Sequence, residues 1–455
     1  MKRVLSLMAL LSLTLSACGS GGVTSSQLPS PNPSPSLTGG QTSGSSAVIA
    51  GLNVAVTAAV LDPATGKGSA FLSFSGPTAA QGLSAQALGF SVVSAPAGLS
   101  VQPAAPNAGT GGVSMLIGVQ ASGTPLGGTL KLKVMLGSQS QVISVPVLVA
   151  RAAALPVVGG SGYLPAVSAS CPNGDVYAAA PVNSAMEQRT LLLRLNAAAG
   201  SVQPLDLGLA LTEGVTSLLC TPAGELWLTI RSDLAQGSVI AHYHSSTGVV
   251  ERFPVGASAD TINNLTRTPD GRLWFVQYKR DRLGEFDPAS GTVTSHAVTD
   301  NAENLTLGQD GSLYFSRFYT DPAIVRYDPA SGGSTALPIG VTNKNLPRAI
   351  VQAQGAVWYV DAWLQQLMRI DPVSGKPSAI ALPPGAAPGE MVAAPDGTVW
   401  VADAALHLLY RLDPGSLTPV TVPLLGALND GPRALNVSAS GQLWYHSGTQ
   451  LVGLQ

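Results

Sequence analysis

The chain has 455 residues, too many for one ordinary domain, and only 11% of them are charged, against roughly 25% in a typical soluble domain. The net charge is −2 at pH 7, and no basic cluster occurs beyond the first three residues, which excludes the usual electrostatic basis for a nucleic-acid partner. Abundant Gly, Ala, Ser, Thr and Pro instead predict an all-β protein with short strands and many turns.

The first residues have the organisation of an export signal, because two basic residues precede an apolar run over 4–17 that is too short to span a bilayer. The run ends in LSAC, residues 15–18. This tetrapeptide resembles the lipobox of bacterial lipoproteins, and the resemblance implies a signal peptide over 1–17 and lipidation of Cys18. The alternative is an ordinary secreted protein that is cut nearby.

Gly19 follows the predicted lipidation site. In the lipoprotein family an Asp at this position often means retention in the inner membrane, so the resemblance favours the outer membrane or the cell surface. Several acyl chains on one cysteine would anchor the chain stably to a membrane. Residues 18–46, rich in Gly, Ser and Pro, predict a disordered tether that cannot build a core. No later segment is apolar enough to predict a transmembrane helix.

Residues 47–150 alternate apolar and polar side chains in short segments, such as GGVSMLIGVQA at 111–121 and GTLKLKVML at 128–136. Turn-forming residues separate these segments, a pattern that predicts an antiparallel β-sandwich. The run from Pro96 to Val147 resembles bacterial immunoglobulin-like modules, which implies a spacer or an adhesive unit. The chain lacks the Cys…Trp…Cys pattern of an antibody-type domain.

A unit of roughly 40–50 residues recurs over the rest of the chain. Its first mark is a turn glycine with Trp or Tyr three residues later: Gly174–Tyr177, Gly224–Trp227, Gly271–Trp274, Gly311–Tyr314, Gly355–Trp358, Gly397–Trp400 and Gly441–Trp444. Its second mark is a turn position, usually Asp, at Asn196, His244, Asp287, Asp328, Asp371 and Asp413.

These marks predict one four-stranded sheet for each unit. In the third unit Gly271 can take the positive φ of a hairpin turn, and the Asp-Pro-Ala-Ser-Gly segment at 287–291 forms a second turn. The predicted strands are 263–268, 272–278, 282–287 and 292–298. A four-stranded sheet repeated at this interval is typical of a propeller blade. The recurring aromatic side chain is expected to pack between neighbouring blades, with a ligand cage as the alternative.

The number of units predicts a seven-bladed β-propeller over 152–455. Six units are complete, whereas the last, Arg433 to Gln455, ends after three strands. Residues 155–158 resemble the ends of other units, such as 337–339, and are expected to supply the missing strand. Closure would leave no strand edge free, so we expect deletion of 152–159 to open the ring and cause aggregation.

Two further cysteines, Cys171 and Cys220, occupy nearly matching places in successive units. An oxidising compartment permits a bridge between them, although two buried free thiols are the favoured interpretation. The chain has no CxxC motif and no Cys/His ligand spacing, so the sequence predicts no zinc site.

The recurring pattern DGxLWFxxxxxxxLGxFDPxxG resembles the virginiamycin B lyase (streptogramin lyase) family over about 155–455. The resemblance implies a β-propeller. The family's lyase opens a cyclic depsipeptide by elimination at an ester, with a histidine base and a metal ion. The family places that histidine in a Pro-His-Gly-Ile-type segment that opens a blade, and its magnesium site includes the Glu of Trp-Phe-x-Glu.

The matching positions of this chain lack both groups. The positions that open the blades are Asn263, Glu303, Arg348, Gly389 and Arg433. The positions three residues after the aromatic are Gln277, Arg317, Asp361, Asp403 and Ser447. The histidines are His242, His244, His296, His407 and His446. Only His446 is expected near the channel; it and Asp361 are the candidate catalytic residues if the chain is an enzyme, and otherwise His446 is a half-buried strand residue.

A polar rim at one mouth of the channel remains as the candidate ligand-binding site: Arg317, Arg348, Asp361, Trp363, Asp403 and Arg433. The alternative is ordinary salt bridging on a solvated face. The predicted function is a cell-envelope lipoprotein whose propeller binds a peptide, glycan or protein, or scaffolds an assembly, without a cofactor. The alternatives are a divergent magnesium-dependent carbon–oxygen lyase that acts on cyclic depsipeptides, and a plain spacer.

Overall fold

The computed structural model contains only strands and turns in the residues that it describes. Among these residues no helix has the length and hydropathy that a membrane crossing requires. The predicted signal peptide and the whole of the predicted tether, with Cys18, lie outside the described residues. The described ranges are 47–49, 52–75, 88–104, 106–109, 112–124, 126–155, 157–158, 161–162, 166–184, 187–196, 199–210, 213–232, 237–255, 261–278, 281–298, 302–317, 322–339, 346–371, 373–425, 431–448 and 450–455.

Two sheets formed by the first ten strands share one hydrophobic core. The first sheet contains β1 (Ala47–Ile49), β2 (Leu52–Val56), β4 (Lys67–Ser75), β8 (Gly112–Ala121), β6 (Leu99–Pro103) and β7 (Asn107–Gly109). The second contains β5 (Leu88–Ser94), β9 (Gly128–Leu136), β10 (Gln139–Ala154) and β3 (Ala59–Leu61), which runs parallel to β10.

Alternation along each strand produces this core. On β9 the side chains of Leu130, Leu132 and Val134 are buried, whereas Lys131 and Lys133 between them are exposed. Residues of a strand point to opposite faces in turn, so one face of the sheet is apolar and packs on the other sheet. The two sheets therefore pack on each other, and their strands pair antiparallel apart from β3, which is parallel to β10.

Six four-stranded sheets follow in chain order, and in each of them consecutive strands pair antiparallel. The first three are β13 (Val167–Ser170), β14 (Val176–Ser184), β15 (Glu187–Asn196) and β16 (Ser201–Leu205); β17 (Glu213–Cys220), β18 (Leu226–Ser232), β19 (Val239–His244) and β20 (Val249–Pro254); and β21 (Thr261–Arg267), β22 (Leu273–Tyr278), β23 (Arg282–Asp287) and β24 (Thr292–Ala297).

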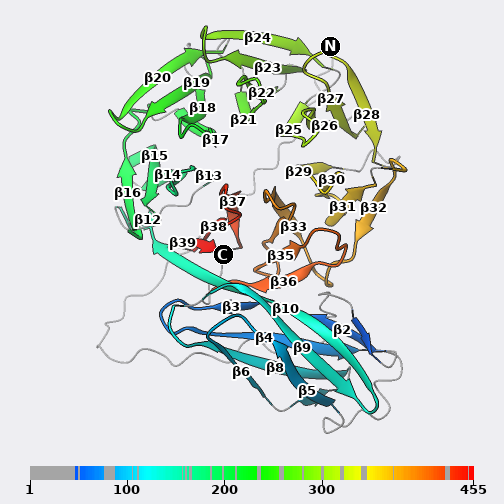
Figure 1. Ribbon diagram of the computed structural model, residues 1–455. Coiled ribbons are helices and arrows are strands. Elements are labelled where there is room, and N and C mark those ends of the chain that lie inside the picture. Colours follow the sequence, from blue (N-terminus) through cyan, green and yellow to red (C-terminus); the bar gives the residue numbers. More distant parts are fainter. Residues whose placement is uncertain are drawn as a thin grey trace, which may run out of the picture. The chain divides into compact units, whose positions relative to one another are not determined.

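The next three are β25 (Ala302–Leu307), β26 (Leu313–Arg317), β27 (Ala323–Tyr327) and β28 (Ser334–Pro338); β29 (Pro347–Ala353), β30 (Ala356–Asp361), β31 (Gln366–Ile370) and β32 (Pro377–Ile380); and β33 (Pro388–Ala393), β34 (Val399–Asp403), β35 (Leu408–Leu412) and β36 (Val420–Pro423). The last sheet contains β37 (Arg433–Val437), β38 (Leu443–Ser447) and β39 (Gln450–Leu454). The first strands of successive sheets contact one another, and β37 contacts β13, so these inner strands form a closed cycle (Figure 1).

A segment from before the first repeat completes the last sheet, but it is not the predicted one. Residues Ala150 to Ala154 of β10 pair antiparallel with β39, from Ala150 opposite Leu454 to Ala154 opposite Gln450. The prediction that 155–158 supplies this strand is wrong, because Val157–Val158 forms β11 and pairs with β12 (Ser161–Gly162). The strand that leaves the sandwich continues directly into the last sheet, so the pairing is complete before residue 155 is reached.

The recurring aromatic side chains lie between neighbouring sheets, as the sequence predicts. All seven are buried, with exposed fractions of 6% or less. Trp227 packs against Leu273 and Phe275 of the following sheet, and Trp274 packs against Phe315 of the sheet after that. Gly271 has a φ of 94°, which confirms the positive φ expected at this hairpin turn.

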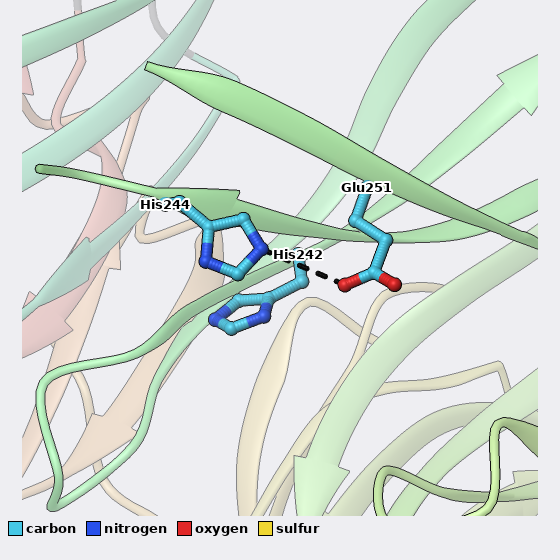
Figure 2. A group of neighbouring side chains, drawn as sticks. All are labelled: His242, His244 and Glu251. Carbon is cyan, nitrogen blue, oxygen red and sulfur yellow. Dashed lines mark ion pairs between the residues drawn. The ribbon is translucent and has the colours of Figure 1, made fainter. Parts of the chain in front are cut away.

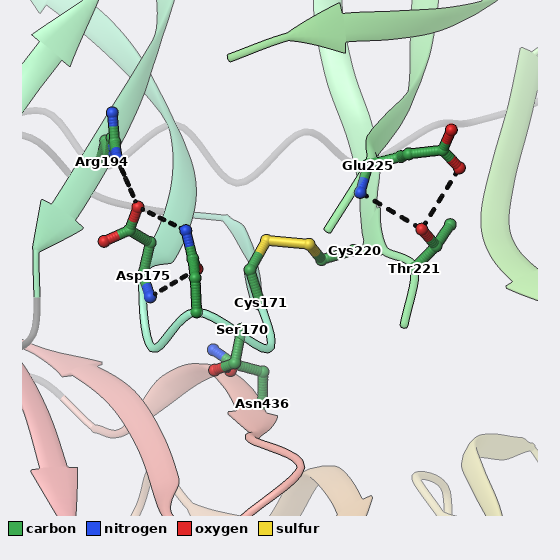
Figure 3. Close-up of a disulfide and its surroundings, with 9 residues drawn as sticks. Ser170, Cys171, Asp175, Arg194, Cys220, Thr221, Glu225 and Asn436 are labelled. Atoms are coloured by element: carbon green, nitrogen blue, oxygen red, sulfur yellow. Dashed lines mark hydrogen bonds and ion pairs between the residues drawn. A yellow bond between two sulfur atoms is a disulfide. The ribbon is translucent and has the colours of Figure 1, made fainter. Parts of the chain in front are cut away.

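Cys171 and Cys220 form a disulfide (Figure 3). Cys171 directly follows β13, and Cys220 ends β17, the neighbouring inner strand. The favoured interpretation of two free thiols is therefore wrong. Matching positions of successive sheets lie side by side, so the Cα atoms are 5.2 Å apart, well within the range that a disulfide spans.

Candidate binding site at one end of the ring

The strand register brings the predicted site residues to one end of the ring. In the last six sheets of the ring the first strand begins beside the point where the second strand ends. The register pairs Ala302 with Arg317, Pro347 with Asp361, Pro388 with Asp403 and Arg433 with His446. Trp363 lies at the same end, in the turn directly after Asp361.

The first strands carry bulges at this end. Positive φ angles occur at Asn264 (56°), Asn304 (55°), Ala349 (43°) and Ala434 (52°), and each lies within a shift of the strand register. A bulge redirects the neighbouring side chain, and non-glycine residues adopt a positive φ at a cost of about 1–2 kcal/mol. The residues that precede them, which are the predicted blade-opening positions, are therefore oriented by an irregular backbone.

Three of the six predicted ligand-binding residues are exposed at this end. Arg348 and Arg433 are exposed, each directly before a positive-φ alanine. Trp363 is 61% exposed, an unusual state for the largest apolar side chain. Together they present two cations and an indole ring to solvent.

The two predicted carboxylates have a different environment, because both are fully buried. Asp361 Oδ1 accepts hydrogen bonds from the backbone N–H groups of Trp363 and Leu364, both at 3.0 Å, and from Leu346 at 3.3 Å. The carboxylate of Asp361 therefore holds the turn that carries Trp363.

Asp403 repeats this arrangement in the next sheet. Its Oδ1 accepts from the N–H groups of Ala405 and Leu406, and its Oδ2 accepts from the Ala387 N–H and the Tyr410 hydroxyl. Asp361 and Asp403 thus act as caps of the two turns that border this end. The prediction that they bind a ligand stays a prediction, and the geometry assigns them a positioning role.

Arg317 and His446 are also buried, with exposed fractions of 8% and 0%. The expectation that His446 is half-buried is wrong. It lies on β38, all five residues of which are buried, because the second strand of a sheet is covered by neighbouring sheets on both faces. Its partner across the strand pair, Arg433, is the exposed member of the two.

Glu390 is a residue of this end that the sequence reasoning missed. It lies on β33, and its Oε2 accepts a hydrogen bond of 2.9 Å from the Leu435 N–H of β37. Surrounding protein raises the pKa of the Glu390 carboxyl, and the amides of Leu435 and Ala434 and the charge of Arg433 oppose this shift. Glu390 is nevertheless an exposed residue, and its carboxylate interacts electrostatically with Arg433. The sequence does distinguish this residue, because it follows Gly389 at a position where other units have Asn or Ala.

Three of the other histidines lie on outer strands, away from the predicted site residues. His242 and His244 are on β19, the third strand of their sheet, and His296 is on the outer strand β24 beside Glu285, with Nε2 to Oε2 at 2.6 Å. His407, in contrast, is exposed at the candidate end itself, in the turn after β34 that Asp403 caps, with a φ of 53°.

The repeated sheets match a known family by sequence over most of their length. The family described as the virginiamycin B lyase family matches residues 194–453, more than half of the chain. The chain belongs to the virginiamycin B lyase family. No curated relative matches the chain by sequence.

Solved structures of this family share the fold. Virginiamycin B lyase from Staphylococcus aureus, in its selenomethionine form, has a TM-score of 0.55 at 18% identity and covers 68% of this chain and 99% of its own. A streptogramin B lyase has a TM-score of 0.56 at 20% identity and covers 68% of this chain and 97% of its own. The protein YCF48 bound to D1 peptide has a TM-score of 0.50 at 11% identity, with 67% and 94% coverage. At these identities the likeness concerns the fold alone.

The residues present at this end of the ring do not fit a magnesium site. Mg²⁺ requires oxygen ligands in near-octahedral geometry. Asp403 accepts backbone N–H groups with both oxygens and Asp361 with Oδ1, so that Asp361 Oδ2, which is buried and has no hydrogen-bond partner, is the one oxygen of the two carboxylates left over, too few for such a site. Within the described ranges, no trio of His, Cys, Asp and Glu side chains at this end lies close enough to share an ion.

Proposed function

We propose that the chain is an exported lipoprotein, anchored through Cys18 in the bacterial cell envelope, whose domain of repeated sheets is a seven-bladed propeller that binds a ligand. The preceding sandwich is proposed to be an immunoglobulin-like spacer between the propeller and the membrane. The ligand is a peptide, a glycan or a segment of another protein, and it binds without turnover at the end of the ring described above.

The binding proposal rests on the different exposure of the side chains at this end. Arg348, Arg433 and Trp363 are exposed, whereas the carboxylates of Asp361 and Asp403 are buried and engaged by the turns. Exposed guanidinium groups bind carboxylates, and an exposed indole stacks on sugar rings or apolar side chains. These groups suit recognition.

A divergent lyase is the second candidate, because family membership favours it. In that case His446 and Asp361 would be the catalytic groups. Both are fully buried, so a substrate would have to displace covering residues before reaching either side chain. A bound magnesium ion would in addition need carboxylate oxygens of which the turns now use three out of four, leaving only the buried Oδ2 of Asp361.

Binding is tested with arrays of peptides and of glycans, probed with the purified chain and with three variants. Trp363→Ala and the double variant Arg348→Glu/Arg433→Glu should each weaken binding of the selected ligands at least about tenfold, because truncation of a central aromatic or Arg anchor commonly costs 2 kcal/mol or more. Leu417→Ala, which removes another exposed apolar side chain, is the control and should leave binding unchanged. Equal binding by all variants would contradict the proposed site.

Anchoring is tested by labelling growing cells with a radioactive or alkyne-bearing fatty acid. The wild-type chain should take up the label and fractionate with membranes, and Cys18→Ser should lose both properties. The Cys171–Cys220 disulfide supports an oxidising compartment, since such bridges are rare in the cytosol of most cells. A Cys18→Ser chain that retains the label would refute the anchoring proposal.

A further inference from the structure

The side chains of His242, His244 and Glu251 meet on the outer half of the second four-stranded sheet (Figure 2). His242 and His244 are two residues apart on β19 and therefore point to the same face. Glu251 on β20 lies directly opposite His242 in the strand pair. One ligand atom from each residue lies within 4.8 Å of the others, and His244 Nε2 is 3.5 Å from Glu251 Oε2.

These two histidines depart from the pattern of the other sheets. The residue opposite the recurring aromatic is Arg194, Arg326, Arg369 or Arg411 in four sheets, Glu285 in the third sheet and His242 here. Two residues later this sheet has His244. The other five four-stranded sheets have Asn196, Asp287, Asp328, Asp371 and Asp413 at this position. The second sheet thus replaces an Arg-x-Asp type of pair with His-x-His.

A packing role accounts for only one of the two replacements. His242 stacks on Trp227 with ring centroids 4.4 Å apart, much as Arg369 lies over Trp358. The aspartates at the second position cap their turns; Asp371 Oδ1, for example, accepts the Ser374 N–H at 2.7 Å. The His244 ring instead lies 4.1 Å from the His242 ring and faces Glu251, which leaves its presence unexplained by the turn.

The donor set selects a class of metal ion. Two imidazole nitrogens and one carboxylate oxygen suit Zn²⁺, Ni²⁺ or Cu²⁺, whereas Mg²⁺ and Ca²⁺ require mostly oxygen ligands. Ligands bound at about 2.0–2.1 Å in a tetrahedron are roughly 3.4 Å apart, so the 3.5 Å between His244 and Glu251 already matches this geometry. To bring all three ligand atoms to this distance, mainly His244 and Glu251 must move. Their side chains are 38% and 53% exposed and are therefore free to adjust.

The cluster borders a pocket that leaves room for a further ligand. His242 and Glu251 line a cavity of about 410 Å³ together with Glu225, Trp227, Phe253 and residues 288–291 of the next sheet. Three protein ligands leave a fourth position of a tetrahedral ion open. The thiols of Cys171 and Cys220 do not compete for the ion, because they are joined in the disulfide.

We propose that His242, His244 and Glu251 bind one divalent transition-metal ion, with Zn²⁺ as the reference ion, on the outer edge of the second sheet. The site is independent of the proposed ligand-binding end of the ring. It lies on the third and fourth strands of its sheet, whereas that end is built from first and second strands.

The test uses the purified, tag-free chain after treatment with a chelator. Calorimetric titration with Zn²⁺ should show saturable binding of one ion per chain, and Co²⁺ should produce the visible absorption of a tetrahedral complex. His244→Ala and Glu251→Gln should each weaken Zn²⁺ binding at least about tenfold, since loss of even a residue that only supports a ligand costs 10–100-fold. Zn²⁺ should also raise the melting temperature of the wild-type chain more than that of either variant.

The matched control is His296→Ala, which removes a histidine paired with a carboxylate, Glu285, on the adjacent sheet. There the second group in contact with Glu285 is Arg272, a guanidinium that is not a metal ligand. This control should bind Zn²⁺ as the wild-type chain does. Absence of saturable binding, or an equal loss in His296→Ala and His244→Ala, would overturn the proposal.

Discussion

Buried carboxylates at the candidate site act through the turns that they hold. Asp361 receives three backbone N–H groups with one oxygen atom, and one of these belongs to Trp363. We expect Asp361→Ala to lower the free energy of unfolding by about 1–3 kcal/mol, because buried N–H groups lose their acceptor. Asp361→Asn keeps an oxygen at this position and should cost less. Denaturant unfolding measures both variants, and equal stability of Asp361→Ala and the wild-type chain would contradict this role.

The raised pKa of Glu390 predicts that its contribution to the stability of the folded chain falls as the pH rises, which is opposite to the effect of most acidic residues. Its pKa in the folded chain is raised above the ordinary value of 4.5, so the folded state holds the proton more tightly than the unfolded state. The stability that Glu390 contributes is therefore complete below about pH 4.5 and is lost as the pH rises through the folded pKa.

The variant Glu390→Gln should remove this decline while keeping an acceptor for the Leu435 N–H. Its stability relative to the wild-type chain should increase between about pH 4 and about pH 7. The increase should be modest, because solvent reaches the side chain and screens its charge. Unfolding curves at both pH values test this, and a gain for Glu390→Gln that is larger at the lower pH would show the sign to be wrong.

The sequence predicted where the site residues lie along their strands better than it predicted whether their side chains are buried. The sequence placed Arg317, Asp361, Asp403 and His446 at one end, and the register agrees. It did not predict that these four side chains are buried, because burial at the end of a second strand depends on the neighbouring sheets. Glu390 was missed for a related reason: its importance comes from the Leu435 N–H on another strand.

At the scale of elements, the disulfide joins the first two four-stranded sheets through their inner strands. The bridge closes a loop with a sequence separation of 49, which corresponds to about 4 kcal/mol of stabilisation when unfolded-chain entropy alone is considered. We expect the double variant Cys171→Ser/Cys220→Ser to lose about 2–4 kcal/mol of unfolding free energy.

Reduction of the wild-type chain should reproduce this loss, and the reductant should leave the double variant unaffected. Denaturant unfolding with and without reductant provides the comparison. A wild-type chain whose midpoint is unchanged by full reduction would show that the bridge does not contribute to stability.

Turn and strand chemistry predicted most elements of the repeat. The four strands expected for the third unit correspond closely to β21–β24, since glycine turns and alternating apolar residues are local signals. The closing strand was misplaced because the similarity between 155–158 and 337–339 is also local. The actual partner of β39 is determined by the path of β10 out of the sandwich, which a comparison of segments does not reveal.

At the scale of the molecule, closure of the ring depends on the last residues of β10. Ala153 is 6% exposed and packs with Trp444 and Leu451, whereas Ala152 beside it is exposed. We expect Ala153→Asp to destabilise the chain by several kcal/mol and to cause aggregation, because it buries an unpaired charge at the closing seam. Ala152→Asp should be nearly neutral. Melting temperature and light scattering distinguish them, and equal behaviour of the two variants would contradict closure by 150–154.

The proposed binding role is compatible with membership of a lyase family. Its family pattern consists mainly of turns and core aromatics, which specify the sheets, whereas the groups that perform elimination occupy few positions. In this chain those positions have other residues, and Asp361 and Asp403 accept backbone N–H groups of the turns that follow them.

Turnover of a cyclic depsipeptide is the most direct measurement of this account. The purified chain is incubated with quinupristin and Mg²⁺, and mass spectrometry follows the linear product, with an active virginiamycin B lyase as the positive control. The account predicts no product above the rate without protein. Magnesium-dependent linear product that is lost in His446→Ala or Asp361→Asn, while these variants stay folded, would contradict it.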